Sequence, residues 1–103
     1  MVASRRSRPP FAPATAIVTG GAAGIGRALA AALVARGGHV VVADIDEEGA
    51  RHTAGRLSAR GPGSASAAAL DVADEAAVDA LVEQVAAERG GLELMVNNAG
   101  VLF

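Results

Sequence analysis

Several residue types are missing from this chain of 103 residues, and each absence excludes a kind of chemistry. Without cysteine there is neither a disulfide framework nor a thiolate metal site, which fits a reducing compartment, and we expect the cytoplasm. Tyrosine is absent, and all nine basic residues are arginine, so lysine is absent as well. A mechanism that needs a tyrosine acid/base or a lysine ammonium cannot be completed within these residues.

Charge and hydropathy narrow the possible partners. The net charge of −2 argues against a surface for nucleic acid or anionic membrane. No apolar run approaches the roughly 20 residues that span a bilayer. His39 and His52 are isolated in the sequence, and we expect no metal site. Half of the chain is apolar, mostly alanine and valine with two Phe and no Trp, which predicts one small domain with a shallow core.

Residues 1–13 are rich in Arg, Ser and Pro, and we interpret them as a flexible leader. Arg5 and Arg6 suggest a twin-arginine export signal as the alternative. Prolines at positions 9, 10 and 13 follow them, where such a signal has an apolar segment. The folded domain is therefore predicted to occupy residues 14–103.

Strands and helices alternate in the predicted domain. Apolar runs predict strands at residues 14–18, 39–43 and 92–96, and helices are predicted to begin near residues 24, 46 and 74. Residues 64–70 are alanine-rich, which favours a helix, but their shortness and their place between helices favour a strand. Ile25, Leu29 and Leu33 are predicted to face the sheet. This order predicts an α/β fold of Rossmann type, an incomplete doubly wound parallel sheet of four strands in the order 3-2-1-4 with flanking helices.

A glycine cluster follows the first predicted strand. Gly20, Gly24 and Gly26 come after Thr19, in a spacing that differs from the G-x-G-x-x-G fingerprint. In a strand–turn–helix context, backbone N–H groups and the positive end of the helix converge there and favour a phosphate. Considered alone, the cluster fits equally well with a glycine-rich turn that has no ligand.

Asp44 ends the second predicted strand, about 20 residues beyond the glycines, where a carboxylate can accept hydrogen bonds from a ribose. Its alternative role is the N-cap of the next helix, which Asp46 could take instead. A carboxylate at this position repels a 2′-phosphate, so NAD is predicted as cofactor rather than NADP. Ile45 follows Asp44, and no basic residue nearby offers to bind the extra phosphate.

Four motifs together resemble the amino-terminal half of the short-chain dehydrogenase/reductase family. They are Thr19–Gly26, Asp44, Asp71-Val72 and Asn97-Asn98-Ala99-Gly100, in the order and spacing of the family. The resemblance implies that Asp71 binds the adenine amino group beside the Val72 backbone, and that Ile25 donates its N–H to the pyrophosphate. It also implies that the segment from Asn97 through Ala99 to Gly100 closes the fourth strand against the adenosine ribose. Alternatively, Asp71 is a turn residue and the asparagines satisfy loop backbone. The cofactor-binding residues predicted in this way are Gly20, Gly24, Ile25, Gly26, Asp44, Ile45, Asp71, Val72, Asn97, Ala99 and Gly100.

The family's catalytic Ser and its Tyr-x-x-x-Lys motif follow later strands, so no catalytic residue is assigned here. The resemblance implies a homo-oligomeric parent enzyme that transfers hydride between NAD and an alcohol or ketone, and we expect this chain to be inactive alone. The alternatives are a non-catalytic nucleotide-binding module, one part of a split enzyme, or an NADP-dependent relative. Ala73 departs from the family, which usually has a hydroxyl residue there to cap the next helix.

Overall fold

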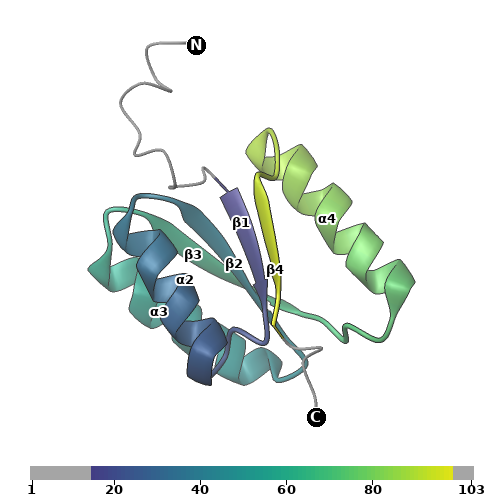
Figure 1. Cartoon of the computed structure of the whole chain (residues 1–103), viewed down its shortest axis with the longest axis horizontal. Helices are drawn as coiled ribbons and strands as arrows, with labels where there is room; N and C mark the ends of the chain where they lie inside the picture. The colour runs from purple at the N-terminus through teal and green to yellow at the C-terminus, as the bar shows by residue number, and fades with distance from the viewer. Residues whose placement is uncertain (1–14, 99–103) are drawn as a thin grey trace.

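The computed structural model describes residues 15–98 of the chain, which form a four-stranded parallel sheet (Figure 1). The strands are β1 (Thr15–Thr19), β2 (His39–Asp44), β3 (Ser64–Ala69) and β4 (Leu94–Asn97). Their order in the sheet is β3-β2-β1-β4, which confirms the predicted order and the Rossmann-type fold. The alanine-rich segment forms a strand because it pairs with β2 along its whole length, from Ser64 opposite His39 to Ala69 opposite Asp44.

Three helices connect the strands and cover both faces of the sheet. Helices α2 (Gly24–Ala35) and α3 (Glu47–Arg60) lie on one face, and α4 (Glu75–Arg89) lies on the other (Figure 1). The chain adds β2 and β3 on one side of β1 and then returns to add β4 on the other side. Because each crossover is right-handed, this change of side places α4 on the opposite face from α2 and α3. None of the described helices is long and apolar enough to cross a membrane.

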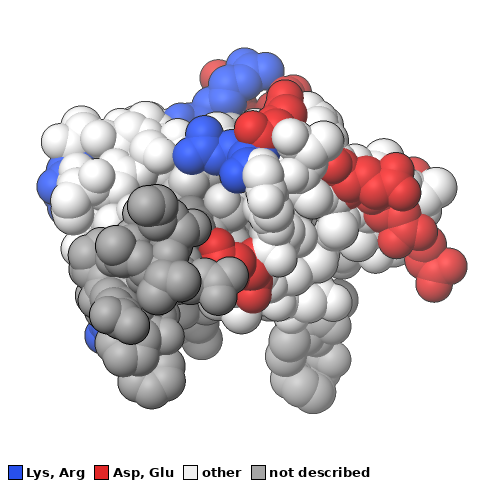
Figure 2. Space-filling view, turned by 90° about the horizontal axis from the view of Figure 1, so that it is seen from above, with Lys and Arg blue, Asp and Glu red and all other residues white. Residues whose placement is uncertain are grey.

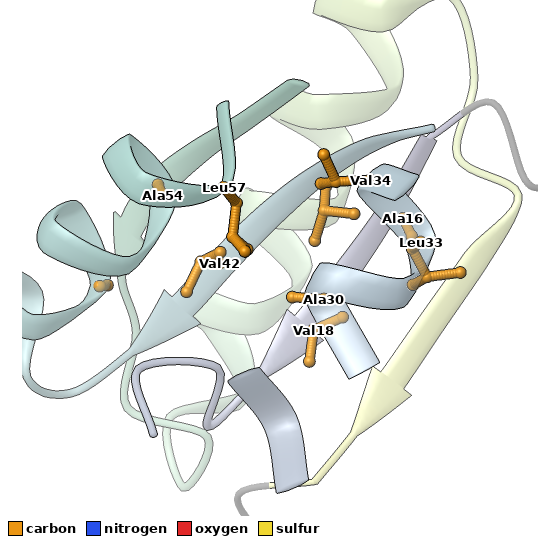
Figure 3. Close-up of a cluster of buried hydrophobic side chains, with 10 residues drawn as sticks. Ala16, Val18, Ala30, Leu33, Val34, Val42, Ala54 and Leu57 are labelled. Atoms are coloured by element: carbon orange, nitrogen blue, oxygen red, sulfur yellow. The ribbon is translucent and has the colours of Figure 1, made fainter. Parts of the chain in front are cut away.

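The face beneath α2 and α3 holds the larger part of the core (Figure 3). Val18 and Val42 project from adjacent strands, and Val34 and Leu57 meet them from the helices. Alanines at positions such as Ala30 and Ala54 let both helix backbones come close to the sheet. The close approach is a consequence of small side chains, as the alanine-rich composition predicts.

Among the described elements, α4 alone covers the opposite face. Ile17 and Val41 alternate along their strands with the residues of the first face, and they pack with Val85, which is buried. Three further apolar residues of α4 are only partly buried against this cluster (Val78, Leu81 and Val82). The core on this face is therefore thinner than the one beneath α2 and α3.

The orientation of α2 differs from the prediction. Ile25 was expected to face the sheet with Leu29 and Leu33, but its side chain is 79% exposed. The buried positions near the start of the helix are Gly26 and Ala30 instead. Successive residues of a helix are about 100° apart, so a helix that turns Gly26 toward the sheet directs Ile25 away from it. Strand β4 also begins two residues later than expected, at Leu94.

Candidate functional site

The candidate site lies at the carboxyl edge of the sheet. Because all four strands are parallel, Thr19, Asp44 and Asn97 end their strands at this same edge. Backbone hydrogen bonds continue from the strand ends into the loops: the Gly20 N–H donates to the Ala43 carbonyl oxygen at 2.8 Å, and the Leu70 N–H donates to that of Asp44 at 3.0 Å. The loops after β1, β2 and β3 are thereby held to one another.

Gly26 brings the first turn of α2 against the turn that leaves β1. A Cβ atom at this position would lie well inside contact distance of the Gly20 carbonyl oxygen and 2.9 Å from the Asn98 Nδ2 atom. The Asn98 amide donates to the same Gly20 oxygen at 3.5 Å. Only glycine allows this approach, so the third glycine of the cluster acts in packing rather than at an open surface.

The amino terminus of α2 has no capping side chain. Its N-cap is Ala23, and its first turn contains no acidic residue. Gly24 adopts a φ of +61°, with no atom within 4 Å of the place where a Cβ would be. This backbone conformation favours glycine. The first N–H groups of a helix have no intrahelical partner, and at α2 no capping side chain takes them up. An anion fits there, because it would satisfy the N–H groups and complement the helix dipole.

The two other helices begin differently. The Asp46 side chain accepts a hydrogen bond from the Gly49 N–H at 3.0 Å and caps α3, which also has two glutamates in its first turn. The Asp74 side chain accepts from the Ala77 N–H at 3.1 Å and caps α4. Position 73 is thus outside the helix, and the alanine there removes no cap. Among the three described helices, only α2 begins without a carboxylate.

Asp44 ties the glycine turn to the end of β2. Its Oδ2 atom accepts from the Ala22 N–H at 3.1 Å, and its Oδ1 atom accepts from the Asp46 N–H at 3.0 Å. Asp46, not Asp44, caps α3. Each carboxylate oxygen has a further lone pair, and the residue is partly exposed. Asp44 can therefore accept additional hydrogen bonds from a ligand while it holds the turn.

Thr53 is a residue of this site that the sequence did not predict. Its side chain is 3% exposed, and its Oγ1 atom donates to the Ala22 carbonyl oxygen at 3.0 Å. Ala22 is consequently fixed on both sides, through its N–H by Asp44 and through its carbonyl by Thr53. The only signal in the sequence is a polar residue on the buried face of α3, beside Ala50, Ala54 and Leu57.

The remaining predicted residues line the same edge. The Oδ1 atom of the exposed Asp71 accepts a hydrogen bond from the Ala73 N–H at 2.9 Å. This is the contact expected if Asp71 is a turn residue, the alternative to adenine binding. The Thr19 hydroxyl lies 3.2 Å from the Asn97 Oδ1 atom, and Ile45 is 75% exposed. Ala99 and Gly100 lie outside the described residues. A cavity of about 370 Å³ opens between β4 and the start of α4, and its lining includes Val72, Glu75, Val78, Asp79, Met95 and Asn97.

Charge is unevenly distributed over the molecule. In Figure 2 acidic side chains gather on the right, the side on which α4 lies in Figure 1. His39 lies at the amino edge of the sheet, with Nδ1 2.7 Å from the Ser64 Oγ atom and Nε2 3.2 Å from that of Ser66. Burial, together with the positive charge of Arg89, lowers the pKa of His39. No group of acidic or histidine residues within residues 15–98 is arranged to hold a metal ion.

Comparisons with known proteins agree with this arrangement. The family model described as short chain dehydrogenase matches residues 14–102. A protein of Macrophomina phaseolina named short chain dehydrogenase/reductase dpmpG is 40% identical over 102 residues, which cover 99% of this chain and 58% of that protein.

Two solved structures have the same fold. A short-chain type dehydrogenase/reductase from Mycobacterium ulcerans superposes with a TM-score of 0.81 at 32% identity, over 86% of this chain and 33% of that one. A metagenomic short-chain oxidoreductase in complex with NADP has a TM-score of 0.78 at 38% identity, over 84% of this chain and 39% of that one. The chain thus spans less than two thirds of the length of each of these relatives.

Proposed function

The chain belongs to the short-chain dehydrogenase family, and from that premise we propose that it binds the adenosine diphosphate half of NAD for an oxidoreductase. The observation that carries this proposal is the Asp44 carboxylate, joined by a 3.1 Å hydrogen bond to a glycine turn that leads into an uncapped helix. A ribose acceptor and a phosphate-binding helix terminus are thereby held in one rigid unit.

In this proposal the pyrophosphate lies at the start of α2. The Ile25 N–H donates to it, while Gly20, Gly24 and Gly26 shape the turn. Support comes from the missing cap at Ala23 and from the first turn of α2, which has no acidic residue to repel an anion. An anion at this position gains both the helix dipole and hydrogen bonds from N–H groups that otherwise depend on water.

The adenosine is proposed to lie across the ends of β2 and β3. Asp44 accepts hydrogen bonds from the ribose, and the exposed Ile45 side chain offers an apolar surface to the base. Asp71 binds the adenine amino group beside the Val72 backbone. Of the two Asp71 oxygens, Oδ2 makes no hydrogen bond within residues 15–98, so it can accept one from a base. Asn97, with Ala99 and Gly100, borders the ribose.

The preference for NAD over NADP depends on Asp44. A 2′-phosphate on that ribose would lie close to the carboxylate, and the two negative charges repel. NADP is the second candidate because the similar metagenomic oxidoreductase was solved in complex with it. Ala22 and Ala23 in the turn and Ile45 after Asp44 are uncharged, so none of the three can pair with a 2′-phosphate. These features favour NAD.

Bound NAD would supply hydride transfer, and the residues described here would bind and orient its adenosine half. The 103 residues contain neither tyrosine nor lysine, so a Tyr–Lys pair cannot move a proton within them. We therefore expect this chain to bind the cofactor without turnover. An alcohol or ketone substrate, a homo-oligomeric assembly and a cytoplasmic location are proposed for the longer parent enzyme.

A titration with NAD and NADP tests the proposal. Asp44→Asn keeps the size of the side chain and removes its charge, so NAD binding should weaken about tenfold, which equals about 1.4 kcal/mol. NADP binding should weaken less, because the repulsion of the 2′-phosphate disappears. Glu83→Gln, an exposed charge removal on α4, is the matched control and should leave both affinities unchanged. An unchanged ratio of the two affinities in Asp44→Asn would refute the ribose role.

A further inference from the structure

A groove lined by arginines lies between the two helices that cover the larger core. A groove of about 360 Å³ separates α2 from α3. Arg27 from α2 and three residues of α3, His52, Arg56 and Arg60, are among the residues that line it. Buried Thr53 and Leu57 also belong to its lining. Among the residues that the structure describes, no acidic side chain lines the groove.

Within the described part of the chain, the arginines of this groove have no carboxylate partner. Among residues 15–98, none of the three arginines forms an ion pair with a carboxylate, whereas Arg51, one turn earlier on α3, pairs with Glu47 at 3.1 Å. Arg56 and Arg60 are four residues apart, so they are neighbours on one side of the helix, where like charges destabilise it. The chain thus concentrates three of its nine basic residues in one groove, although its net charge is −2.

We propose that this groove binds a small anion with several phosphate groups. Its volume is in the range of small-molecule sites and is too small for a folded partner. Guanidinium groups bind phosphate oxygens through paired N–H donors, and here they come from both walls, with Arg27 opposite Arg56 and Arg60. Adjacent phosphates can contact both walls at once, so an oligophosphate should bind more tightly than a single phosphate or a carboxylate.

The groove adjoins the site proposed for NAD and shares Gly24 with it, but its charged residues lie elsewhere. The arginines of the groove lie along the sides of α2 and α3, whereas Asp44, Asp71 and Asn97 lie at the carboxyl edge of the sheet. The two sites meet at Ala22, whose N–H bonds to Asp44 and whose carbonyl bonds to Thr53 of the groove lining. The inference does not depend on the proposed function, because neither Arg56 nor Arg60 belongs to the cofactor site.

The test is a calorimetric titration of the full chain with inorganic tripolyphosphate at low salt. We expect one site, and we expect the double variant Arg56→Gln/Arg60→Gln to weaken binding at least tenfold without altering the affinity for NAD. Arg89→Gln, which removes an exposed charge at the end of α4, is the control and should bind tripolyphosphate as the wild type does. All three arginines are exposed, and circular dichroism should report an unchanged fold.

Several results would overturn the proposal. Absence of tripolyphosphate binding, or an equal loss of affinity in Arg89→Gln, would exclude a specific site. Competition by NAD, together with no effect of the double variant, would assign tripolyphosphate to the start of α2. Tighter binding of a glutamate-rich peptide than of tripolyphosphate would assign the groove to an acidic protein segment instead of a phosphate-rich anion.

Discussion

Replacement of Gly26 by alanine tests how the turn and the helix are joined. The added Cβ would lie 2.8 Å from the Gly20 carbonyl carbon and 2.9 Å from the Asn98 Nδ2 atom, both closer than real Cβ contacts. Backbone atoms are the nearest neighbours, so no side-chain rotation can relieve the overlap. The start of α2 must move away from the turn by roughly an ångström. Such overpacking costs about 1–3 kcal/mol.

The same shift should weaken cofactor binding as well as lower stability. It separates the amino terminus of α2 from Asp44, which is fixed to the turn through Ala22. A displacement of this size in a binding site reduces affinity because hydrogen bonds to the ligand depend steeply on distance. We expect Gly26→Ala to lower the free energy of unfolding by about 2 kcal/mol and to weaken NAD binding by a factor of ten or more.

Gly55→Ala provides a matched control in the same chain. Gly55 lies in the middle of α3, and a Cβ there would meet no atom within 4 Å. Alanine should stabilise the helix by about 0.5–1 kcal/mol, with no effect on NAD. Because the chain has neither tryptophan nor tyrosine, unfolding in urea is best followed by far-ultraviolet circular dichroism. Gly26→Ala with the stability and NAD affinity of the wild type would refute the packing argument.

Three further predictions follow from other contacts. Thr53→Val leaves the Ala22 carbonyl without its hydrogen bond, so it should lower the free energy of unfolding in urea by about 1–2 kcal/mol and weaken NAD binding. An unchanged NAD affinity would mean that the turn does not need this hydrogen bond. Because the pKa of His39 is lowered in the folded chain, the unfolded chain binds a proton more readily, and stability should fall as the pH drops below about 6.5. The loss should be smaller in His39→Gln, and a wild-type stability that does not change with pH in this range would contradict the prediction. Asp74→Ala removes the cap of α4 and should cost about 1 kcal/mol, whereas Ala73→Ser, outside the helix, should add no stability.

Most element boundaries were predictable because the sequence marks them locally, and the strand order followed from the alternation of strands and helices. Glycine pairs and aspartates follow the apolar runs, and these residues favour turns and helix starts wherever they occur. The strand at Ser64–Ala69 was the difficult case, since alanine favours a helix. We predicted a strand because the segment lies between two helices, and the prediction is confirmed. The segment is extended in the structure because it pairs with β2 along its whole length.

The features that were missed depend on contacts between distant parts of the chain. Ile25 was expected in the core because its spacing from Leu29 and Leu33 fits one face of a helix. The contact of Gly26 with Gly20 sets the rotation of α2 instead, and no helical pattern contains that information. Thr53 escaped prediction because its partner is a backbone carbonyl 31 residues away. Asp44 could be identified because its position at a strand end is itself a sequence signal.

Residues 15–98 are proposed to bind the adenosine diphosphate half of NAD at the carboxyl edge of the sheet. Backbone amide shifts of the labelled chain, recorded during a titration with NAD, test it most directly. We predict large shifts at Ala22, Ile25 and Ile45, next to the turn and the end of β2, and smaller ones at Val72. Gly55, in the middle of α3, should not shift. Saturating NAD that moves no amide of the glycine turn, or moves Gly55 as much as Ile25, would contradict the account.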